Sequence, residues 1–239
     1  MSRNDKLWFK FCGIRSSDMD CWLIEYPERG LARAKGIEQN VPGRDGLLWI
    51  PENAREDYPL TLHVKFGKNA NLNFVRAWLA GVGDLVICDE PSLAYKNARL
   101  SKHFEGGRFL PGCAAQRVQL HFTTSPYRYE YPEKEPQTFT TSGAYINNPG
   151  TAPSEPRITI TGNGDFSVTI NAQLMQFSAV SDGIIVDSEL MDCLNPDGLS
   201  LANHLAMMDD FPLLQPGDNM ISWTGNVTSV TIEPRWRYV

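Results

Sequence analysis

The sequence predicts a mainly β protein with two domains, and three observations support this prediction. Stretches of alternating apolar and polar residues recur along the 239 residues, whereas one segment has helical periodicity. In the second half, turn signals recur roughly every ten residues, which is typical of an antiparallel sandwich. Residues 1–134 carry 19 Lys+Arg and 16 Asp+Glu (net +3), while residues 135–239 carry 3 and 12 (net −9). We therefore expect a barrel-like or sandwich-like β domain over 1–134, with one α-helix and extended arms, and an antiparallel β-sandwich over 135–239.

The first domain is expected to combine short strands with a single helix. The strand candidates are Leu7–Cys12, Cys21–Tyr26, Leu47–Ile50, Leu60–Phe66, Leu85–Cys88 and Val118–Phe122. The helix is expected near residues 71–80. Asn69 or Asn71 can cap its start, and Gly81 suits a left-handed position after its end. Its apolar stripe consists of Leu72, Val75, Trp78 and Leu79.

Two stretches of the first domain, residues 26–46 and 89–113, have little periodicity. Loops longer than roughly 12 to 15 residues are uncommon in compact domains unless they have a function. We therefore expect at least one of them to be an arm that reaches outside its own domain. Val41–Gly46 reads as a sharp turn before the strand at Leu47, so Arg44 and Asp45 project from it. They either bind a neighbouring subunit or are solvated, two alternatives of about equal weight.

The second domain begins after a Pro-, Ser- and Thr-rich stretch, which we interpret as a linker with the boundary near residue 134. Its prolines are Pro132, Pro136, Pro149, Pro153 and Pro156. Residues Ile158–Ile170 alternate on both sides of Asn163-Gly164, which predicts a hairpin there. Further turns are expected at Asp182-Gly183, Asn195–Gly198 and Gly225-Asn226.

The composition argues against several protein classes. The five cysteines lack the two-residue spacing of zinc sites and redox motifs, so we expect reduced thiols. No run of eighteen apolar residues and no signal-like start occurs, which favours a soluble product made in a cytoplasm. Basic residues are interleaved with acidic ones, so we expect no specific binding of nucleic acid.

No motif predicts a catalytic, cofactor or metal site. His63, His103, His121 and His204 lack metal-ligand spacing, and the sequence contains no Gly-x-Ser-x-Gly. Gly162–Ser167 lacks the lysine and the following helix of a phosphate loop, and no histidine partner can be assigned to Cys113. The acidic pairs Asp187/Glu189 and Asp209/Asp210 lie beside turns and read as solvated loop ends. Trp223 and Trp236 could stack on a sugar, although core packing is the more frequent fate of such residues.

Several segments in this order resemble one family. Val41–Gly46, Val75–Pro91 and Phe122–Glu130 resemble the N-terminal domain of the distal tail (Dit) proteins of long-tailed, non-contractile bacteriophages. Asn147–Asn171, Gly183–Glu189 and Asp210–Gly225 are similar to the galectin-like C-terminal sandwich of that family. The resemblance covers nearly the whole chain.

This resemblance implies a structural hub at the tail tip of a virion. Family members form hexameric rings, single or paired back to back, through whose channel DNA passes. Their partners are the tail tube protein, a tail-associated hub or lysin protein and receptor-binding proteins. Extended segments of the N-terminal domain reach the neighbouring subunit, so the candidate interface residues are Leu31, Arg33, Lys35, Arg44 and Asp45. No membrane, cofactor or enzymatic activity is implied, and synthesis is expected in the cytoplasm of the bacterial host.

The alternative of a different class is a carbohydrate-binding adhesin that recognises cell-wall sugars through the second domain. Galectins bind galactosides with a His-x-Asn-x-Arg strand and a Trp-x-x-Glu-x-Arg strand. Here His204 is followed by Leu205 and Ala206, and Trp223 has no Glu-x-Arg after it. The resemblance therefore predicts the sandwich fold without the galectin sugar motif. An enzymatic function is less favoured than either the tail hub or the adhesin.

Overall fold

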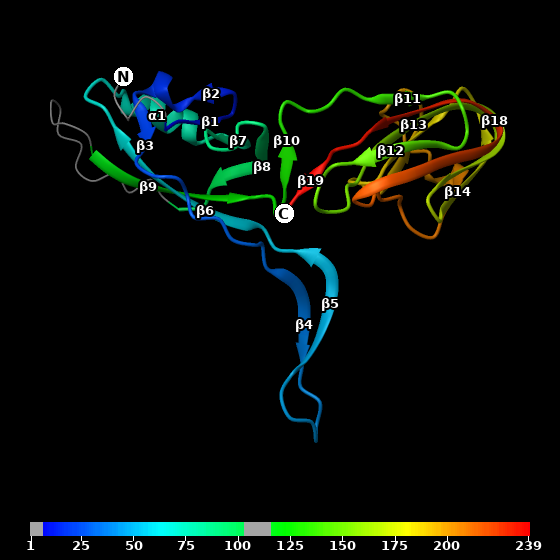
Figure 1. Cartoon of the computed structure of the whole chain (residues 1–239), viewed down its shortest axis with the longest axis horizontal. Helices are drawn as coiled ribbons and strands as arrows, with labels where there is room; N and C mark the ends of the chain where they lie inside the picture. The colour runs from blue at the N-terminus through cyan, green and yellow to red at the C-terminus, as the bar shows by residue number, and fades with distance from the viewer. Residues whose placement is uncertain (1–6, 103–115) are drawn as a thin grey trace. The chain divides into compact units, whose positions relative to one another are not determined.

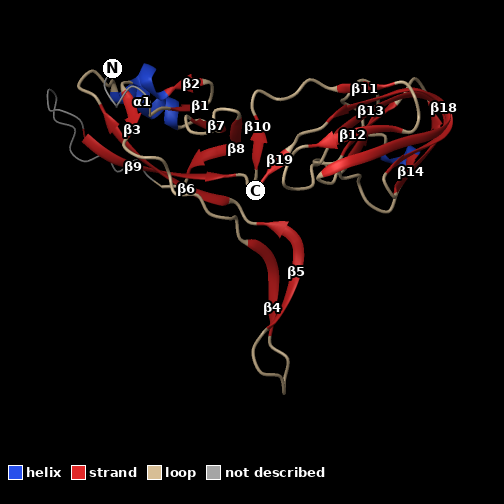
Figure 2. Cartoon of the chain, in the orientation of Figure 1, coloured by secondary structure: helices blue, strands red, loops and turns tan. Residues whose placement is uncertain are grey.

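The computed structural model describes residues 7–102 and 116–239, and the chain divides into two compact units. The first unit comprises residues 1–131 together with Val239, and the second comprises residues 132–238. Strands make up most of both units (Figure 2), and α1 is the sole α-helix among the described residues. The mainly β fold class predicted from the sequence is confirmed.

The elements of the first unit begin with a short β-hairpin and end at β10 (Figure 1). They are β1 (Phe9–Phe11), β2 (Ile14–Arg15), the 3-10 turn η2 (Ser16–Met19), β3 (Cys21–Leu23), β4 (Ala34–Gln39), β5 (Leu48–Arg55), β6 (Tyr58–Phe66), α1 (Leu72–Leu79), β7 (Gly83–Ile87), β8 (Leu93–Leu100), β9 (Gln116–Thr124) and β10 (Arg128–Glu130). Each strand candidate of the first half overlaps one of these strands.

The helix α1 lies where its cap and its apolar stripe predict it. The Asn71 side chain accepts a hydrogen bond from the backbone N–H of Asn73 at 3.1 Å, which satisfies a free donor of the first turn. Val75, Trp78 and Leu79 are buried against the sheet. A three-residue contact on one helical face is what an amphipathic helix of two turns offers, and it places α1 on the core.

Gly81 does not take the left-handed conformation that we expected after the helix. The helix ends in a right-handed residue, Ala80, and Gly81 packs closely on Cys12 instead. A Cβ atom at Gly81 would lie 3.1 Å from the Cys12 Sγ atom. The absence of a side chain here serves close packing rather than a left-handed turn.

The strand β8 joins two halves of the curled sheet in the first unit. The strand order is β2-β1-β7-β8-β9-β6-β3, with antiparallel neighbours, and β10 also pairs with β8. Ala94–Ala98 pair with β7, whereas Arg99 and Leu100 pair with β9. Side chains from both halves and from α1 meet in one core, which includes Phe9, Phe11, Leu62, Val64, Trp78, Leu85, Leu120 and Phe122.

The interpretation of residues 89–113 as an arm or loop is wrong for Leu93–Leu100, which form β8. Asn97 has φ 52° and interrupts the strand's alternation, which hides its period of two from sequence reading. Ala94, Tyr95 and Ala98 are nevertheless buried. His103 and Cys113 lie outside the described residues.

The second unit is an antiparallel β-sandwich built around two long strands. Its elements are β11 (Gln137–Phe139), β12 (Ala144–Asn148), β13 (Arg157–Ile170), β14 (Gln173–Val180), β15 (Ile184–Asp187), β16 (Asp192–Leu194), the 3-10 turn η3 (Asn203–Leu205), β17 (Ala206–Met207), β18 (Gly217–Glu233) and β19 (Arg237–Tyr238). One half of the β13–β18 pair lies between β12 and β14, and the other half lies between β11 and β15. Inward side chains from both halves share one core, which confirms the predicted sandwich.

The hairpin predicted at Asn163-Gly164 is wrong, and so is the turn predicted at Gly225-Asn226. Both sites are irregularities within continuous strands, and they lie opposite each other. On β13 the step from Gly162 to Phe166 faces the step from Val227 to Gly225 on β18, so β13 carries extra residues there. The strands continue past this bulge into the second layer instead of reversing. The Asp182-Gly183 turn between β14 and β15 is confirmed.

The Pro-rich stretch is part of the sandwich for most of its length, which corrects its interpretation as a free linker. β11 and β12 both pair with β18. β11 is polar and exposed except for Phe139, whereas β12 buries Ile146 and Asn148. Both strands are short and lie at the edge of their layer, so the sequence shows no long alternation there. The exposed segment before them is residues 132–136.

Candidate functional site: a projecting β-hairpin

The first aperiodic stretch, expected to be an arm, is half of a β-hairpin. β4 and β5 pair only with each other among the described strands, in the register Ile37 with Ile50 and Glu38 with Trp49. The pair stands away from the curled sheet of its unit (Figure 1). Hereafter "the arm" means residues 33–56. An isolated two-stranded hairpin is marginally stable in water, so such an arm normally gains stability from a covering surface.

Large apolar side chains on and beside the arm are exposed to solvent. They are Leu31 (70%), Ile37 (57%), Leu47 (55%), Ile50 (42%) and Trp49 (41%). Single exposed apolar residues are common, but a group of five on one slender element is not explained by the fold of the monomer. The group is what a protein–protein contact requires.

The two faces of the arm differ in chemistry. Residues directly paired across the hairpin share a face, so Ile37 and Ile50 lie on one side and Glu38 and Trp49 on the other. The Trp49 indole lies over Gly36, where a Cβ atom would come within 2.5 Å of the ring. One face is therefore aliphatic, and the other presents an aromatic ring beside a carboxylate.

The tip of the arm is the turn that the sequence predicts. Arg44 N–H donates to the Val41 carbonyl at 3.2 Å, and Gly43 has φ 82°. Arg44 and Asp45 are exposed at this tip. Their role in a subunit contact stays a hypothesis.

The start of the arm places the other predicted interface residues at the surface. Leu31, Arg33 and Lys35 are all exposed. The five candidate residues thus belong to the hairpin or to the segment leading into it. The sequence reasoning missed Ile37, Trp49 and Ile50 as interface residues, because neither 34–39 nor 48–55 alternates between apolar and polar residues. The available signal was the apolar run Leu47–Ile50 directly after the turn at Val41–Gly46.

The base of the arm is fixed to the sheet by charged and polar groups. Arg29 bonds Asp89 at 2.7 Å and Glu90 at 2.8 Å, and Glu90 also pairs with Arg128. Burial acts to lower the pKa of Arg29, but the Asp89 carboxylate outweighs it and the pKa is raised above its ordinary value. Arg29 therefore stays charged and holds the segment before the arm.

Hydrogen bonds at the root complete this attachment. The Tyr58 hydroxyl accepts from Gly30 N–H at 2.7 Å, and Glu56 N–H donates to the Arg33 carbonyl at 2.8 Å. The Tyr58 ring stacks on Tyr95 of β8, with centroids 6.1 Å apart. The arm thus leaves a rigid root at a defined point of the sheet.

The two tryptophans considered as sugar platforms have different environments. Trp236 is 2% exposed in the core of the sandwich, so burial leaves no ring face for a sugar, and its reading as a platform is wrong. Trp223 is half-buried and packs against the same core. Of these two tryptophans, only Trp223 has a ring that could still stack on a sugar.

Asp187 differs from its interpretation as a solvated loop end. Its side chain is 4% exposed and binds Arg235 through two bonds, of 2.7 Å and 2.9 Å. Burial acts to raise the pKa of Asp187, but the bonds from Arg235 outweigh it and lower the pKa below its ordinary value. This is a structural ion pair. Asp209 and Asp210 are exposed, as expected.

The remaining chemistry-bearing residues do not gather into a site. Within residues 7–102 and 116–239, no group of three His, Cys, Asp or Glu side chains could hold a metal ion. His63 pairs with Glu25 at 2.9 Å, and His121 bonds Thr61 at 3.0 Å. No helix in the described part of the chain has the length and apolarity to span a membrane.

Comparison with known proteins yields a likeness of structure rather than of sequence. No family model matches this chain, and no curated protein matches it. The crystal structure of the Dit protein (gp 19.1) of phage SPP1 superposes with a TM-score of 0.71 at 16% sequence identity, covering 95% of this chain and 98% of that one. That protein is described as a paradigm of the hub adsorption apparatus in phages that infect Gram-positive bacteria. The resemblance found in the sequence is thereby confirmed at the level of the fold, and the chain has a Dit-like fold over nearly its whole length.

Proposed function

We propose that this protein is a structural subunit of a bacteriophage tail tip that assembles with copies of itself into a ring-shaped hub. The observation that carries the proposal is the Dit-like fold, which covers 95% of the chain and includes both units. An unrelated protein with a similar sandwich would match over the second unit alone. The proposed location is the tail of the virion.

The arm supplies the means of assembly. It exposes apolar side chains that its own unit does not cover, and its root is held rigidly. An arm that binds a different surface on the next copy makes a heterologous contact, and such contacts close into a ring when the rotation allows. A hexamer is the proposed stoichiometry, as a single ring or as two rings back to back.

The proposed partners are the tail tube protein on one side of the ring and the tail-associated hub or lysin protein on the other. The second unit is proposed to be galectin-like and to carry receptor-binding proteins. DNA would pass through the channel without specific binding, because the charge of the first 134 residues is only +3 and the rest is acidic. We expect no shift of duplex DNA on a gel at 150 mM salt, where the Debye length is about 8 Å.

The adhesin alternative has less support than the hub. Trp236 is buried, so a platform for sugars depends on the half-buried Trp223. Binding of the intact protein to a glycan array, lost in Trp223→Ala, would revive this alternative.

Native mass spectrometry of the full chain tests the proposal. We expect complexes that are multiples of the 26.8 kDa subunit, with six copies as the main species. Replacing residues 34–55 with a short Gly-Ser turn should give monomers, because the covered apolar surface is removed. Leu199→Ser is the control, since Leu199 is 87% exposed but lies in the second unit. Full assembly by a folded, armless variant would contradict the role of the arm.

A further inference from the structure

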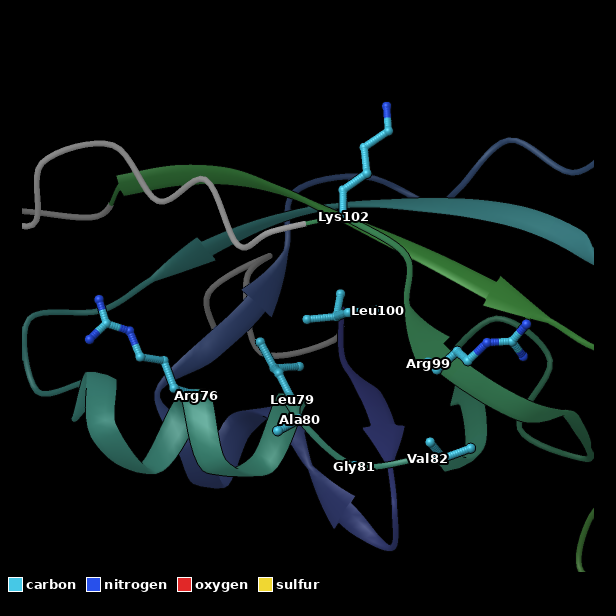
Figure 3. A pocket seen from close by; sticks show the side chains of 8 residues that line it. All are labelled: Arg76, Leu79, Ala80, Gly81, Val82, Arg99, Leu100 and Lys102. Carbon is cyan, nitrogen blue, oxygen red and sulfur yellow. The ribbon is translucent and has the colours of Figure 1, made fainter.

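A pocket on the first unit has an apolar floor and a basic rim. Its volume is about 430 Å³, and it is lined by the end of α1, the segment after it and the end of β8. Leu79 and Leu100 lie between the side chains of Arg76, Arg99 and Lys102 (Figure 3). All the charged residues among the described lining are basic. The pocket is therefore suited to an apolar group that carries a negative charge beside it.

The rim cations are not equivalent. Arg99 already pairs with Asp57 at 2.8 Å, next to the root of the arm. Among the described residues, Arg76 and Lys102 have no such carboxylate partner. They are the rim groups that an incoming carboxylate would meet.

One face of the arm has the matching chemistry. Trp49 is 41% exposed, and the Glu38 carboxylate lies across the hairpin on the same face. The opposite face carries Ile37 and Ile50 without an aromatic ring. Tryptophan is one of the side chains enriched as anchors in interface pockets, because its ring buries a large area at a low cost in conformational entropy.

The arm of a copy holds Trp49 away from the pocket of that same copy. Trp49 lies seven positions before Glu56 at the root, which corresponds to roughly 23 Å of extended chain. The arm also stands away from the sheet that carries the pocket (Figure 1). A second copy has no such restriction, and its arm and pocket would remain free to bind further copies.

We propose that this pocket receives the Trp49 face of the arm of a neighbouring copy, with the indole on Leu79 and Leu100 and the Glu38 carboxylate beside Arg76 and Lys102. The proposal rests on the self-assembly proposed above and names the acceptor surface. The contact is head-to-tail, since the arm and the pocket are different surfaces of the same unit.

Charge reversal and its rescue test the pairing. Glu38→Lys and Lys102→Glu should each raise the concentration at which half of the chain is assembled by at least tenfold, measured by light scattering. The double variant Glu38→Lys/Lys102→Glu should recover most of the loss, because the opposite charges again face each other. Glu52→Lys is the matched control: it makes the same charge change on the other face of the arm and should have a smaller effect.

Mixing two defective chains tests the head-to-tail geometry. One chain carries Glu38→Lys and Trp49→Ala in the arm, and the other carries Arg76→Glu and Lys102→Glu in the pocket. Each alone should be monomeric, with an unchanged thermal unfolding midpoint. Their mixture has one intact arm and one intact pocket, so native mass spectrometry should show a 1:1 dimer and no larger species.

The outcomes separate this proposal from the proposed function. If the wild-type chain forms rings and the pocket variants form them equally well, the pocket is the wrong acceptor while the hub stands. A mixture that stays monomeric also overturns the pocket. A monomeric wild-type chain would overturn both.

Discussion

The protein contains two long antiparallel strand pairs, and their surroundings are opposite. The β13–β18 pair runs through both layers of the sandwich, and its inward side chains, such as Ile160, Val168 and Ile170, are fully buried. The β4–β5 pair has Ile37 and Ile50 at comparable cross-strand positions, yet both are exposed. The chain itself covers the apolar side chains of the β13–β18 pair, whereas it leaves those of the β4–β5 pair exposed to solvent.

This difference separates the residues that stabilise the fold from those that serve assembly. An apolar residue in the sandwich stabilises the monomer by leaving water during folding. An apolar residue on the arm gains this stabilisation only when a second surface covers it. Substitutions on the two strand pairs should therefore affect different measurements.

The largest expected difference comes from one substitution made at two isoleucines. Ile170→Ala should lower the free energy of unfolding by about 4 kcal/mol, because Ile170 is fully buried and a cavity remains. Ile37→Ala should change it by less than about 0.5 kcal/mol but weaken assembly. Urea unfolding and light scattering measure the two effects. Equal losses of stability would contradict the conclusion that Ile170 stabilises the fold whereas Ile37 serves assembly.

An ion pair at each region gives the next contrast. Asp187→Asn should cost about 3 kcal/mol, because it removes the carboxylate charge that binds Arg235 where Asp187 is 4% exposed and leaves Arg235 only the exposed Glu189 at 3.1 Å. Asp57→Asn, beside the arm, removes an exposed partner of Arg99 and should cost less than about 1 kcal/mol. Thermal unfolding of the two variants at pH 7 checks the order.

The pH dependence of stability should follow from Asp187. Its pKa is lowered in the folded state, so the unfolded state binds protons more readily. The stabilisation is complete above the ordinary carboxyl pKa near 3.9 and is lost as the pH falls through the lower folded value. Urea unfolding of Asp187→Asn should show a shallower loss of stability below about pH 4 than the wild type. Identical slopes would mean that Asp187 does not contribute.

Two glycines with positive φ provide a smaller contrast. Gly225→Ala should cost about 2 kcal/mol, because the new Cβ atom would lie 2.8 Å from the Asp165 carbonyl oxygen at the strand corner. Gly43→Ala, at the tip of the arm, meets nothing within 4 Å and should cost about 1 kcal/mol for its backbone alone. A larger loss at Gly43 than at Gly225, measured by urea unfolding, would show that the tip is packed.

The smallest effect on stability is expected from cutting the connection between the units, which we propose fold independently. Trypsin should cleave after Lys134, within the exposed segment 132–136, and leave a resistant fragment that begins near residue 135. The fragment should unfold at the same temperature as the second unit in the intact chain. Mass spectrometry of the digest identifies the cut, and a chain that stays intact there would argue against the boundary.

Most local elements could be predicted from the sequence. The alternation of residues 60–66 and the stripe of Val75, Trp78 and Leu79 follow from burial on one face, which imposes a period. The Val41–Gly46 turn follows from backbone chemistry alone. These features depend on interactions within a few residues, and a sequence displays them directly.

The pairing of segments far apart in the chain could be predicted less well, and the reason is physical. Asn163-Gly164 has the composition of a hairpin turn, but pairing with β18 on both sides keeps β13 extended through a bulge. Asp187 looks like a loop residue until Arg235, 48 residues later, binds it. The choice between turn and bulge, or between solvated and paired, is made by partners that a local pattern does not contain.

By itself the sequence determined the β class, the strand candidates, the single helix near residues 71–80, the uneven charge and a resemblance to distal tail proteins. The tertiary structure alone decided that β13 and β18 cross both layers, that Trp236 is buried, and that Ile37, Trp49 and Ile50 are left uncovered. The periodicity of a strand or helix indicates that its two faces have different environments. Which environment is a core, and which is a surface awaiting a partner, depends on contacts between segments far apart in the chain.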